Sequence, residues 1–220
     1  MAKPIRCEPL PAEIVREYGP FPGAEHIAGV TFDGSDVWFA AGDHLQAFDP
    51  STGDTKRTLD VSAAHGTTFD GRYLWQLSDD GIRKIDPDTG QVLKVLPAPV
   101  GDSNAGLAWA EGSLWIGQYS QRRIIRIDAE TGEILKTLES SRFVTGVTWS
   151  NGELWHATWE EDESEIRRID PESGDVLEQL TLPEGKIVTG LEADGDLFYC
   201  GGGRSGKLRA VRRPKRARRP

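Results

Sequence analysis

The sequence predicts an all-β fold: a five-bladed β-propeller of four-stranded antiparallel blades. Three observations lead to this prediction. A similar unit recurs at spacings of 37 to 44 residues, and its copies begin at Gly29, Gly66, Gly106, Gly146 and Gly190. Each copy contains short apolar runs separated by turn residues, and none shows a helical period. Repeats of this length with four strands are typical of propeller blades, which bury their faces by packing radially.

The copy at residues 106–138 shows the four expected strands in order. Small apolar residues open it, and a Glu-Gly turn leads to a second strand centred on Trp115. Residues 123–128 then alternate basic and apolar side chains, as a half-buried third strand does. A Thr-Gly turn, whose glycine can supply a positive φ, precedes an alternating fourth strand.

The other copies carry the same landmarks at constant offsets. A large aromatic side chain stands nine residues after every repeat glycine: Trp38, Trp75, Trp115, Trp155 and Tyr199. Four copies end their third strand in an apolar residue and Asp, followed by Thr-Gly or Ser-Gly. We expect the aromatic side chains to fill the core between neighbouring blades.

The two ends of the chain predict how the ring closes. The fifth copy has only three strands, and residues 13–18 resemble the fourth strands of the other copies. We therefore expect this N-terminal strand to be the outer strand of the last blade, which ties the two ends together. The propeller domain is predicted over residues 1–211, and the basic residues 212–220 are expected to be a disordered tail.

Composition and charge limit the function classes. The net charge is −9, yet all 35 acidic residues precede Arg204, and nine of the 26 basic residues lie from Arg204 onward. Such an acidic body argues against DNA binding by the propeller itself. No run of 18 apolar residues predicts a membrane span, and no apolar segment near the N-terminus predicts a secretory signal. A cytoplasmic monomer is the expectation.

The loops predict which face of the propeller binds. On one face, the constant face, the turns between strands one and two and between strands three and four are nearly identical in most blades. On the other, the variable face, the connecting loops differ from blade to blade. A ligand at the central axis is not fivefold symmetric, so we expect a small molecule or peptide on the variable face. The candidate ligand-binding residues are His26, Asn104, Tyr119, Trp159 and Glu160.

Two hypotheses concern particular side chains of this face. His26 and His65 precede repeat glycines of adjacent blades and could together hold a divalent metal or act as an acid–base pair; the alternative is solvated loop histidines. Residues 159–165 form the longest insertion, predicted as a loop in which Trp159 beside Glu160 could stack on an amine-bearing ligand. The alternative is that Trp159 turns inward and caps the neighbouring blade.

The pattern GVTFDGSDVWFA followed by IDPDTG resembles the propellers of the glutamine cyclotransferase (plant-type glutaminyl cyclase) and virginiamycin B lyase superfamily. Five blades and the segment SNGELWHA are more similar to the cyclotransferases, because virginiamycin B lyase has seven blades. The resemblance implies an activity in which an N-terminal glutamine amine attacks its own side-chain amide.

The residues of this chain depart from that family at one position. The Glu that family members commonly carry before the repeat glycine is replaced by Ala28, His65, Ala105, Thr145 and Thr189. A non-catalytic binding propeller is therefore the favoured function. An enzyme of the cyclotransferase or lyase type is the alternative, with Glu192 and His65 as candidate catalytic residues.

Overall fold

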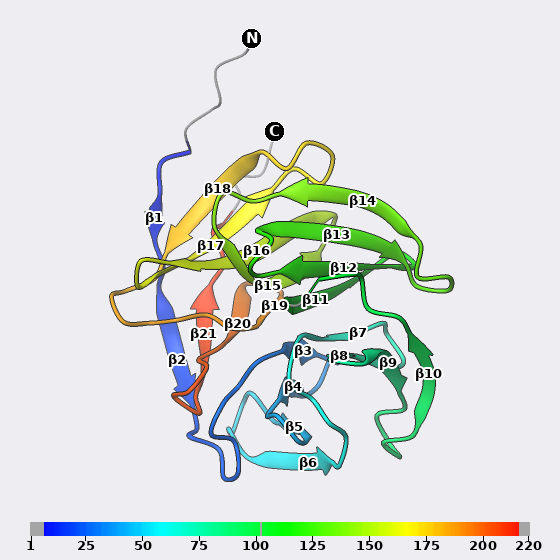
Figure 1. Cartoon of the computed structure of the whole chain (residues 1–220). Coiled ribbons are helices and arrows are strands. Elements are labelled where there is room, and N and C mark those ends of the chain that lie inside the picture. Colours follow the sequence, from blue (N-terminus) through cyan, green and yellow to red (C-terminus); the bar gives the residue numbers. More distant parts are fainter. Residues whose placement is uncertain (1–6, 102, 216–220) are drawn as a thin grey trace.

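The structure is a computed structural model that describes residues 7–101 and 103–215, and all its regular elements in that range are strands. Five sheets stand around a central axis, where the inner strands of all blades gather (Figure 1). The five-bladed β-propeller predicted from the sequence is confirmed. Within the described range there is no helix of the length and apolar character needed to cross a bilayer.

The strands follow the repeat in chain order. Blade one comprises β3 (Val30–Phe32), β4 (Val37–Ala40), β5 (Leu45–Phe48) and β6 (Thr55–Leu59). Blade two comprises β7 (Thr67–Phe69), β8 (Leu74–Ser78), β9 (Gly81–Ile85) and β10 (Val92–Leu96). Blade three comprises β11 (Asn104–Ala110), β12 (Ser113–Gln118), β13 (Arg123–Asp128) and β14 (Ile134–Glu139). Blade four comprises β15 (Phe143–Ser150), β16 (Glu153–Glu160), β17 (Glu163–Ile169) and β18 (Val176–Thr181). Blade five contains β19 (Leu191–Asp194), β20 (Leu197–Gly201) and β21 (Leu208–Arg212).

The N-terminal strand β2 (Ile14–Tyr18) completes blade five, as predicted. It pairs antiparallel with β21, so that Tyr18 lies opposite Leu208, and the two strands run side by side in Figure 1. Ion pairs reinforce the pairing, since Arg209 Nε lies 2.8 Å from a Glu17 carboxylate oxygen. Closure by the two chain ends therefore leaves the last blade with the same four strands as the others.

A short strand before β2 was not expected from the sequence. Strand β1 (Leu10–Pro11) pairs in parallel with β18, which adds a fifth strand to blade four. Ala12 continues this contact by donating its N–H to the carbonyl of Thr181 at 2.8 Å. The N-terminal segment thus crosses from the edge of blade four to the edge of blade five.

The five repeat glycines form a closed ring of backbone contacts at the axis. A methyl group built on Gly190 would lie 2.1 Å from the carbonyl oxygen of Ala28, and one on Gly66 would lie 2.4 Å from the Leu107 nitrogen. Gly29, Gly106 and Gly146 face the next inner strand in the same way. Glycine is required here because adjacent backbones approach too closely for any side chain.

The repeat aromatic residues fill the spaces between blades. Trp75 stacks on Trp109 of the following blade with ring centroids 5.8 Å apart, and Trp115 stacks on Trp149 at 6.2 Å. Trp38, Trp75, Trp115, Trp155 and Tyr199 are all buried. Their predicted place in the core is confirmed, and each side chain faces the blade that follows its own.

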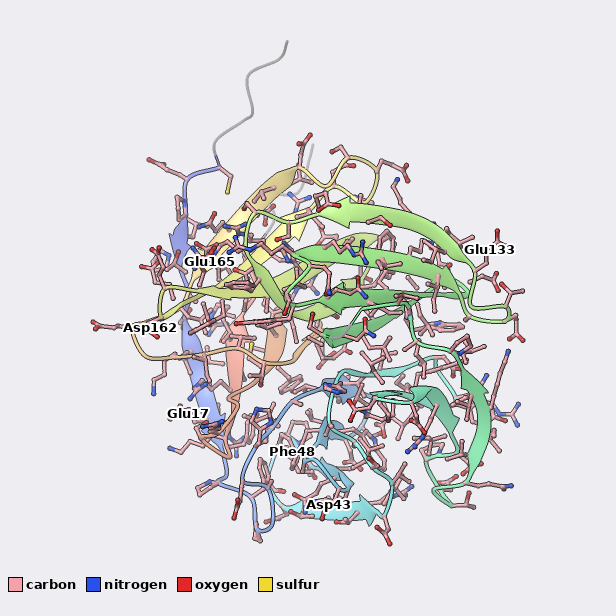
Figure 2. The ribbon with its side chains drawn as sticks, viewed as in Figure 1. Glu17, Asp43, Phe48, Glu133, Asp162 and Glu165 are labelled. Atoms are coloured by element: carbon pink, nitrogen blue, oxygen red, sulfur yellow. The ribbon has the colours of Figure 1, made fainter. Side chains whose placement is uncertain are left out.

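The insertion at residues 159–165 is not a loop, contrary to expectation. Strands β16 and β17 extend through it, and only Glu161 and Asp162 form the turn, with φ of 50° and 63°. Left-handed φ values at both positions belong to the tight turn that suits a twisted hairpin. Asp162 therefore lies at the tip of a long hairpin (Figure 2), and Trp159 belongs to β16.

Candidate functional site

The mouth of the channel on the variable face is hollowed into a pocket of about 190 Å³. All five blades contribute to its lining, which consists of His26, Ala28, Ala64, His65, Ala105, Tyr119, Thr145 and Thr189. Five of these residues immediately precede the five repeat glycines, so the pocket lies directly beside the glycine ring. The lining contains no carboxylate among the described residues.

The structure brings His26 and His65 to this same pocket. Nε2 of His65 lies 2.8 Å from an oxygen of Asp79, whose carboxylate is exposed. His26 is also exposed in part, yet burial lowers its pKa below 6.5, and the charges of Arg204 and His65 lower it further. The His26 imidazole is therefore neutral at pH 7 and offers one donor and one acceptor.

Two threonine hydroxyls beside the histidines differ in their hydrogen bonding. The Thr189 hydroxyl accepts the N–H of Gly203 at 3.1 Å and donates to the carbonyl of Ile27. The Thr145 hydroxyl is buried and has no partner among the described residues. An unpaired buried hydroxyl costs free energy, which a ligand or water in the pocket would recover.

Tyr119 forms the wall of the pocket on the side of blades three and four. Its ring stacks on that of Phe143 with centroids 4.7 Å apart. The Phe143 ring also contacts the guanidinium of Arg122, which lies 4.1 Å from its centroid. Burial first, and then the charge of Glu160, raises the pKa of the Tyr119 hydroxyl, so it remains a donor at all ordinary pH values.

Trp159 and Glu160 lie beside this wall. Trp159 pairs with Phe143 in the β15–β16 ladder and is half-buried, so it is neither a free loop residue nor fully enclosed. The Glu160 carboxylate lies 2.5 Å from Arg122, which neutralises it. Near the aromatic rings, the acidic side chain that was expected to attract an amine is therefore already paired with an arginine. The remaining acidic residues of this hairpin lie at its exposed turn.

Asn104 is turned away from the pocket. Its side-chain oxygen accepts the Gln118 amide at 2.7 Å, and its amide donates to the carbonyl of Pro99 at 3.2 Å. These bonds hold the loop that precedes β11. Asn104 therefore positions a loop beside the mouth and does not line it.

The predicted metal would have few protein ligands. Within residues 7–101 and 103–215, no three His, Cys, Asp or Glu side chains gather in a way that would hold a metal ion. Only His26 and His65 would remain, whereas zinc sites ordinarily use three or four protein ligands. The geometry thus gives the metal hypothesis no support.

Glu192 lies on the other side of the glycine ring from this pocket. It follows Gly190 on β19, whereas Thr189 at the mouth precedes that glycine. Its carboxylate accepts hydroxyl hydrogen bonds from Thr31 at 2.9 Å and Thr148 at 3.0 Å. Burial raises the pKa of Glu192 to about 7, although these bonds oppose the shift. Glu192 and His65 therefore do not share one site.

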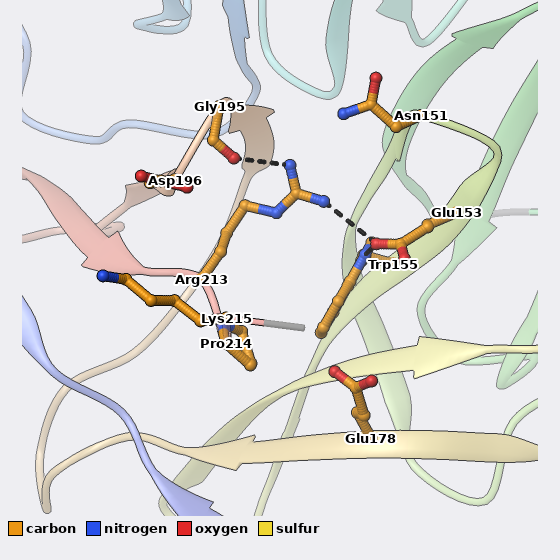
Figure 3. A pocket seen from close by; sticks show the side chains of 9 residues that line it. All are labelled: Asn151, Glu153, Trp155, Glu178, Gly195, Asp196, Arg213, Pro214 and Lys215. Atoms are coloured by element: carbon orange, nitrogen blue, oxygen red, sulfur yellow. Dashed lines mark hydrogen bonds and ion pairs between the residues drawn. The ribbon is translucent and has the colours of Figure 1, made fainter. Parts of the chain in front are cut away.

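A second cavity, of about 230 Å³, lies on the constant face between blades four and five (Figure 3). Ala193 stands there at the position where the other blades carry aromatic residues: Phe32, Phe69, Trp109 and Trp149. Arg213 occupies the space, donating to the Gly195 carbonyl at 2.9 Å and to Glu153 at 3.1 Å. Of the predicted tail, Arg212 is the last residue of β21 and Arg213 binds to the propeller, whereas residues 216–220 lie outside the described residues.

No protein-family model matches the chain, and no curated protein matches its sequence. Solved structures do share its fold. One is the crystal structure of Myxococcus xanthus glutaminyl cyclase, with 15% sequence identity and a TM-score of 0.75, covering 93% of this chain and 98% of that chain. At this identity the likeness concerns the fold. The chain is thus a five-bladed β-propeller that resembles a glutaminyl cyclase in fold over nearly its whole length.

Proposed function

We propose that the protein binds a small molecule or the end of a peptide at the channel mouth on its variable face. The observation that carries the proposal is the asymmetric lining of the pocket. Blades that are alike elsewhere present two alanines, two threonines and a histidine just before the repeat glycines. The propeller itself needs no such difference, whereas an asymmetric ligand does.

The pocket's size and chemistry describe the part of the ligand that would enter it. A volume of about 190 Å³ is smaller than the pockets that enclose drug-sized molecules, which suits a single side chain or a small fragment. The alanines offer apolar contact, and Thr145, Tyr119 and the neutral His26 offer hydrogen bonds. Trp159 and Phe143, beside the mouth, offer aromatic surface for the remainder of a peptide.

Tryptophan fluorescence titrated with free amines and with short peptides tests this proposal. We expect a saturable change with at least one probe, and we expect Tyr119→Ala and Thr145→Val to weaken it. Asp88→Asn, on the constant face, is the matched control and should leave the affinity unchanged. Probes that bind equally well to all four proteins would place the ligand elsewhere and contradict the proposal.

An enzyme is the second candidate, and the carboxyl of Glu192 is the observation that favours it. A carboxyl with a pKa of about 7 is suited to acid–base catalysis near neutral pH. If the shared fold extends to the activity, a peptide with N-terminal glutamine would cyclise and release ammonia. Ammonia release with the wild type but not with Glu192→Gln would support an enzyme. If the wild type releases no ammonia, the enzyme hypothesis fails and only the binding function remains.

The predictions of a cytoplasmic location and of a monomer stay predictions. A small molecule or peptide is the proposed partner, and the acidic body argues against DNA on the propeller itself. Gel filtration with light scattering would measure the oligomeric state directly.

A further inference from the structure

A crevice of about 230 Å³ lies between blades three and four, apart from both the channel mouth and Glu192. Blade three and the segment after it contribute Ile124, Glu139, Ser140 and Ser141, and blade four contributes His156, Arg167, Ile169, Gly174, Asp175 and Val176. It is a candidate binding site because two of its lining side chains, His156 and Arg167, are polar and almost completely buried.

His156 follows the repeat Trp155 and faces blade three. Only 2% of its surface is exposed, and its buried Nδ1 has no hydrogen-bond partner among the described residues. Burial and the nearby Arg167 lower the pKa of His156 to about 3, so the ring is neutral and carries one donor and one acceptor. Leaving the buried Nδ1 unpaired costs free energy that a bound molecule would recover.

Arg167 supplies positive charge at the same inner end. Its guanidinium lies 2.6 Å from the Glu165 carboxylate and donates to the Ser141 hydroxyl at 2.9 Å. Glu165, labelled in Figure 2, also faces Arg142 at 3.5 Å, so one buried carboxylate is shared by two arginines. The group of three therefore carries one excess positive charge, and Arg167 keeps free N–H donors.

The rim of the crevice has the opposite character. Glu139 and Asp175 line it with carboxylates and are both exposed to solvent. Between the rim and the inner end lie the apolar side chains of Ile124, Ile169 and Val176. Donors and positive charge thus lie inside, and negative charge lies outside.

We propose that this crevice binds a small zwitterion of the α-amino-acid type. The ligand carboxylate accepts hydrogen bonds from Arg167, His156 and Ser141, and its ammonium group lies toward Glu139 and Asp175. A simple anion would meet repulsion at the rim, and a simple cation would meet the excess charge of the arginines. The volume corresponds to about eight water molecules, at ~30 Å³ each, which suits a small amino acid.

Isothermal titration of the full chain with L-alanine, acetate and methylamine tests the class of ligand. We expect L-alanine to bind at least about tenfold more tightly than either single-charge probe. His156→Phe should abolish binding, and it should fold because blade one carries Phe39 at the equivalent position. Asp88→Asn, at an exposed turn of blade two outside both sites, is the control and should bind L-alanine like the wild type.

A rim variant separates the two charges of the ligand. Asp175→Asn should weaken L-alanine about threefold or more while it strengthens acetate, because one rim carboxylate is neutralised. Three results would each overturn the proposal. They are a lack of saturable L-alanine binding to the wild type, an equal affinity of the wild type for acetate, and full L-alanine binding by a folded His156→Phe variant. The binding proposed at the channel mouth is unaffected by any of these results.

Discussion

Glu192 shows how one residue can join three blades. Its equivalents in three other blades are threonines, and Thr68 and Thr148 each accept a backbone N–H from the next inner strand. Glu192 reaches further, since it accepts from Thr148 of blade four and from Thr31 of blade one. A carboxyl at this position therefore links the blades on both sides of the last one.

The raised pKa of Glu192 predicts how stability depends on pH. The folded pKa of about 7 exceeds the ordinary value of 4.5. Between pH 4.5 and pH 7, the native state therefore keeps a proton that the unfolded state has lost. The protonated carboxyl contributes stability that is fully present below about pH 4.5 and is lost as the pH rises through 7. We expect Glu192→Gln to exceed the wild type in unfolding free energy at pH 8 by on the order of 2 kcal/mol.

Urea unfolding at several pH values measures this difference. The advantage of Glu192→Gln should shrink toward zero near pH 5, where the wild-type carboxyl is also neutral. Glu161→Gln, at the exposed hairpin turn, is the matched control for the loss of one surface charge and should leave the unfolding free energy nearly unchanged. An advantage of the Gln variant that is the same at pH 5 and pH 8 would contradict the proton linkage.

Sequence differences between blades identify the candidate residues of the variable face, but they do not predict which contacts these residues make. His26, His65 and Tyr119 line one pocket, whereas Asn104 bonds to its own loop. The stacking of Tyr119 on Phe143 could not be read from the sequence, because it depends on the packing of two blades.

At the scale of elements, basic side chains of the outer strands bind the next blade. Arg16 of β2 donates to the carbonyl of Ser51 at 2.8 Å, and Lys94 of β10 donates to the carbonyl of Glu130 at 2.9 Å. Arg57 and Lys136 reach the acidic turns of blades two and four in the same manner. Each exposed pair of this kind contributes little to the free energy of unfolding, but the same contact recurs between successive blades around the ring.

Closure by β2 predicts different outcomes for two truncations. Deleting residues 1–12 removes β1, whose pairing with β18 is short, and should lower the melting temperature by only a few degrees, for ~1 kcal/mol of lost hydrogen bonds. Deleting residues 1–18 also removes β2 and exposes the whole edge of β21.

Thermal unfolding followed by circular dichroism compares the two deletions with the full chain. We expect the longer deletion to lose its cooperative transition or to aggregate, because the last blade is left with three strands. Equal melting temperatures for both deletions would show that the ring holds without its N-terminal strand.

At the scale of the whole molecule, the glycine ring sets how closely five blades can approach. Gly190→Ala places a methyl group 2.1 Å from the carbonyl oxygen of Ala28, so two inner strands must separate. We expect a loss of about 3 kcal/mol or more, because the methyl group would overlap backbone atoms of residues 28–30 rather than flexible side chains. Urea unfolding measures the loss.

Gly71→Ala is the control for the ring prediction. Its φ of 95° strains a side chain, but a methyl group there meets open space. We expect a loss of only about 1–2 kcal/mol, from backbone strain alone. A larger loss at Gly71 than at Gly190 would contradict the importance of the ring.

The interface between blades four and five depends on Arg213. Its guanidinium lies 5.9 Å from the Trp155 ring centroid and 5.3 Å from that of Phe198, in the space that Ala193 leaves open. We expect Arg213→Ala to cost about 2–3 kcal/mol in unfolding free energy, because the variant loses the ion pair with the largely buried Glu153 and the hydrogen bond to the Gly195 carbonyl. Lys215→Ala, two residues later and exposed, should cost little; equal losses would refute the role of Arg213.

The sequence by itself determined the number of blades, the order of their strands and the closure of the ring. Those features follow from side-chain alternation, turn residues and a constant repeat length, all of which act within a few residues. Only the tertiary structure decided that residues 159–165 extend a hairpin, that Thr145 lacks a partner among the described residues and that Glu192 lies apart from His65. The placement of Glu192 depends on contacts between blades, such as its bond with Thr31 at 161 residues' separation. A local pattern carries no information about such contacts, because they arise only when the ring of blades brings distant strands together.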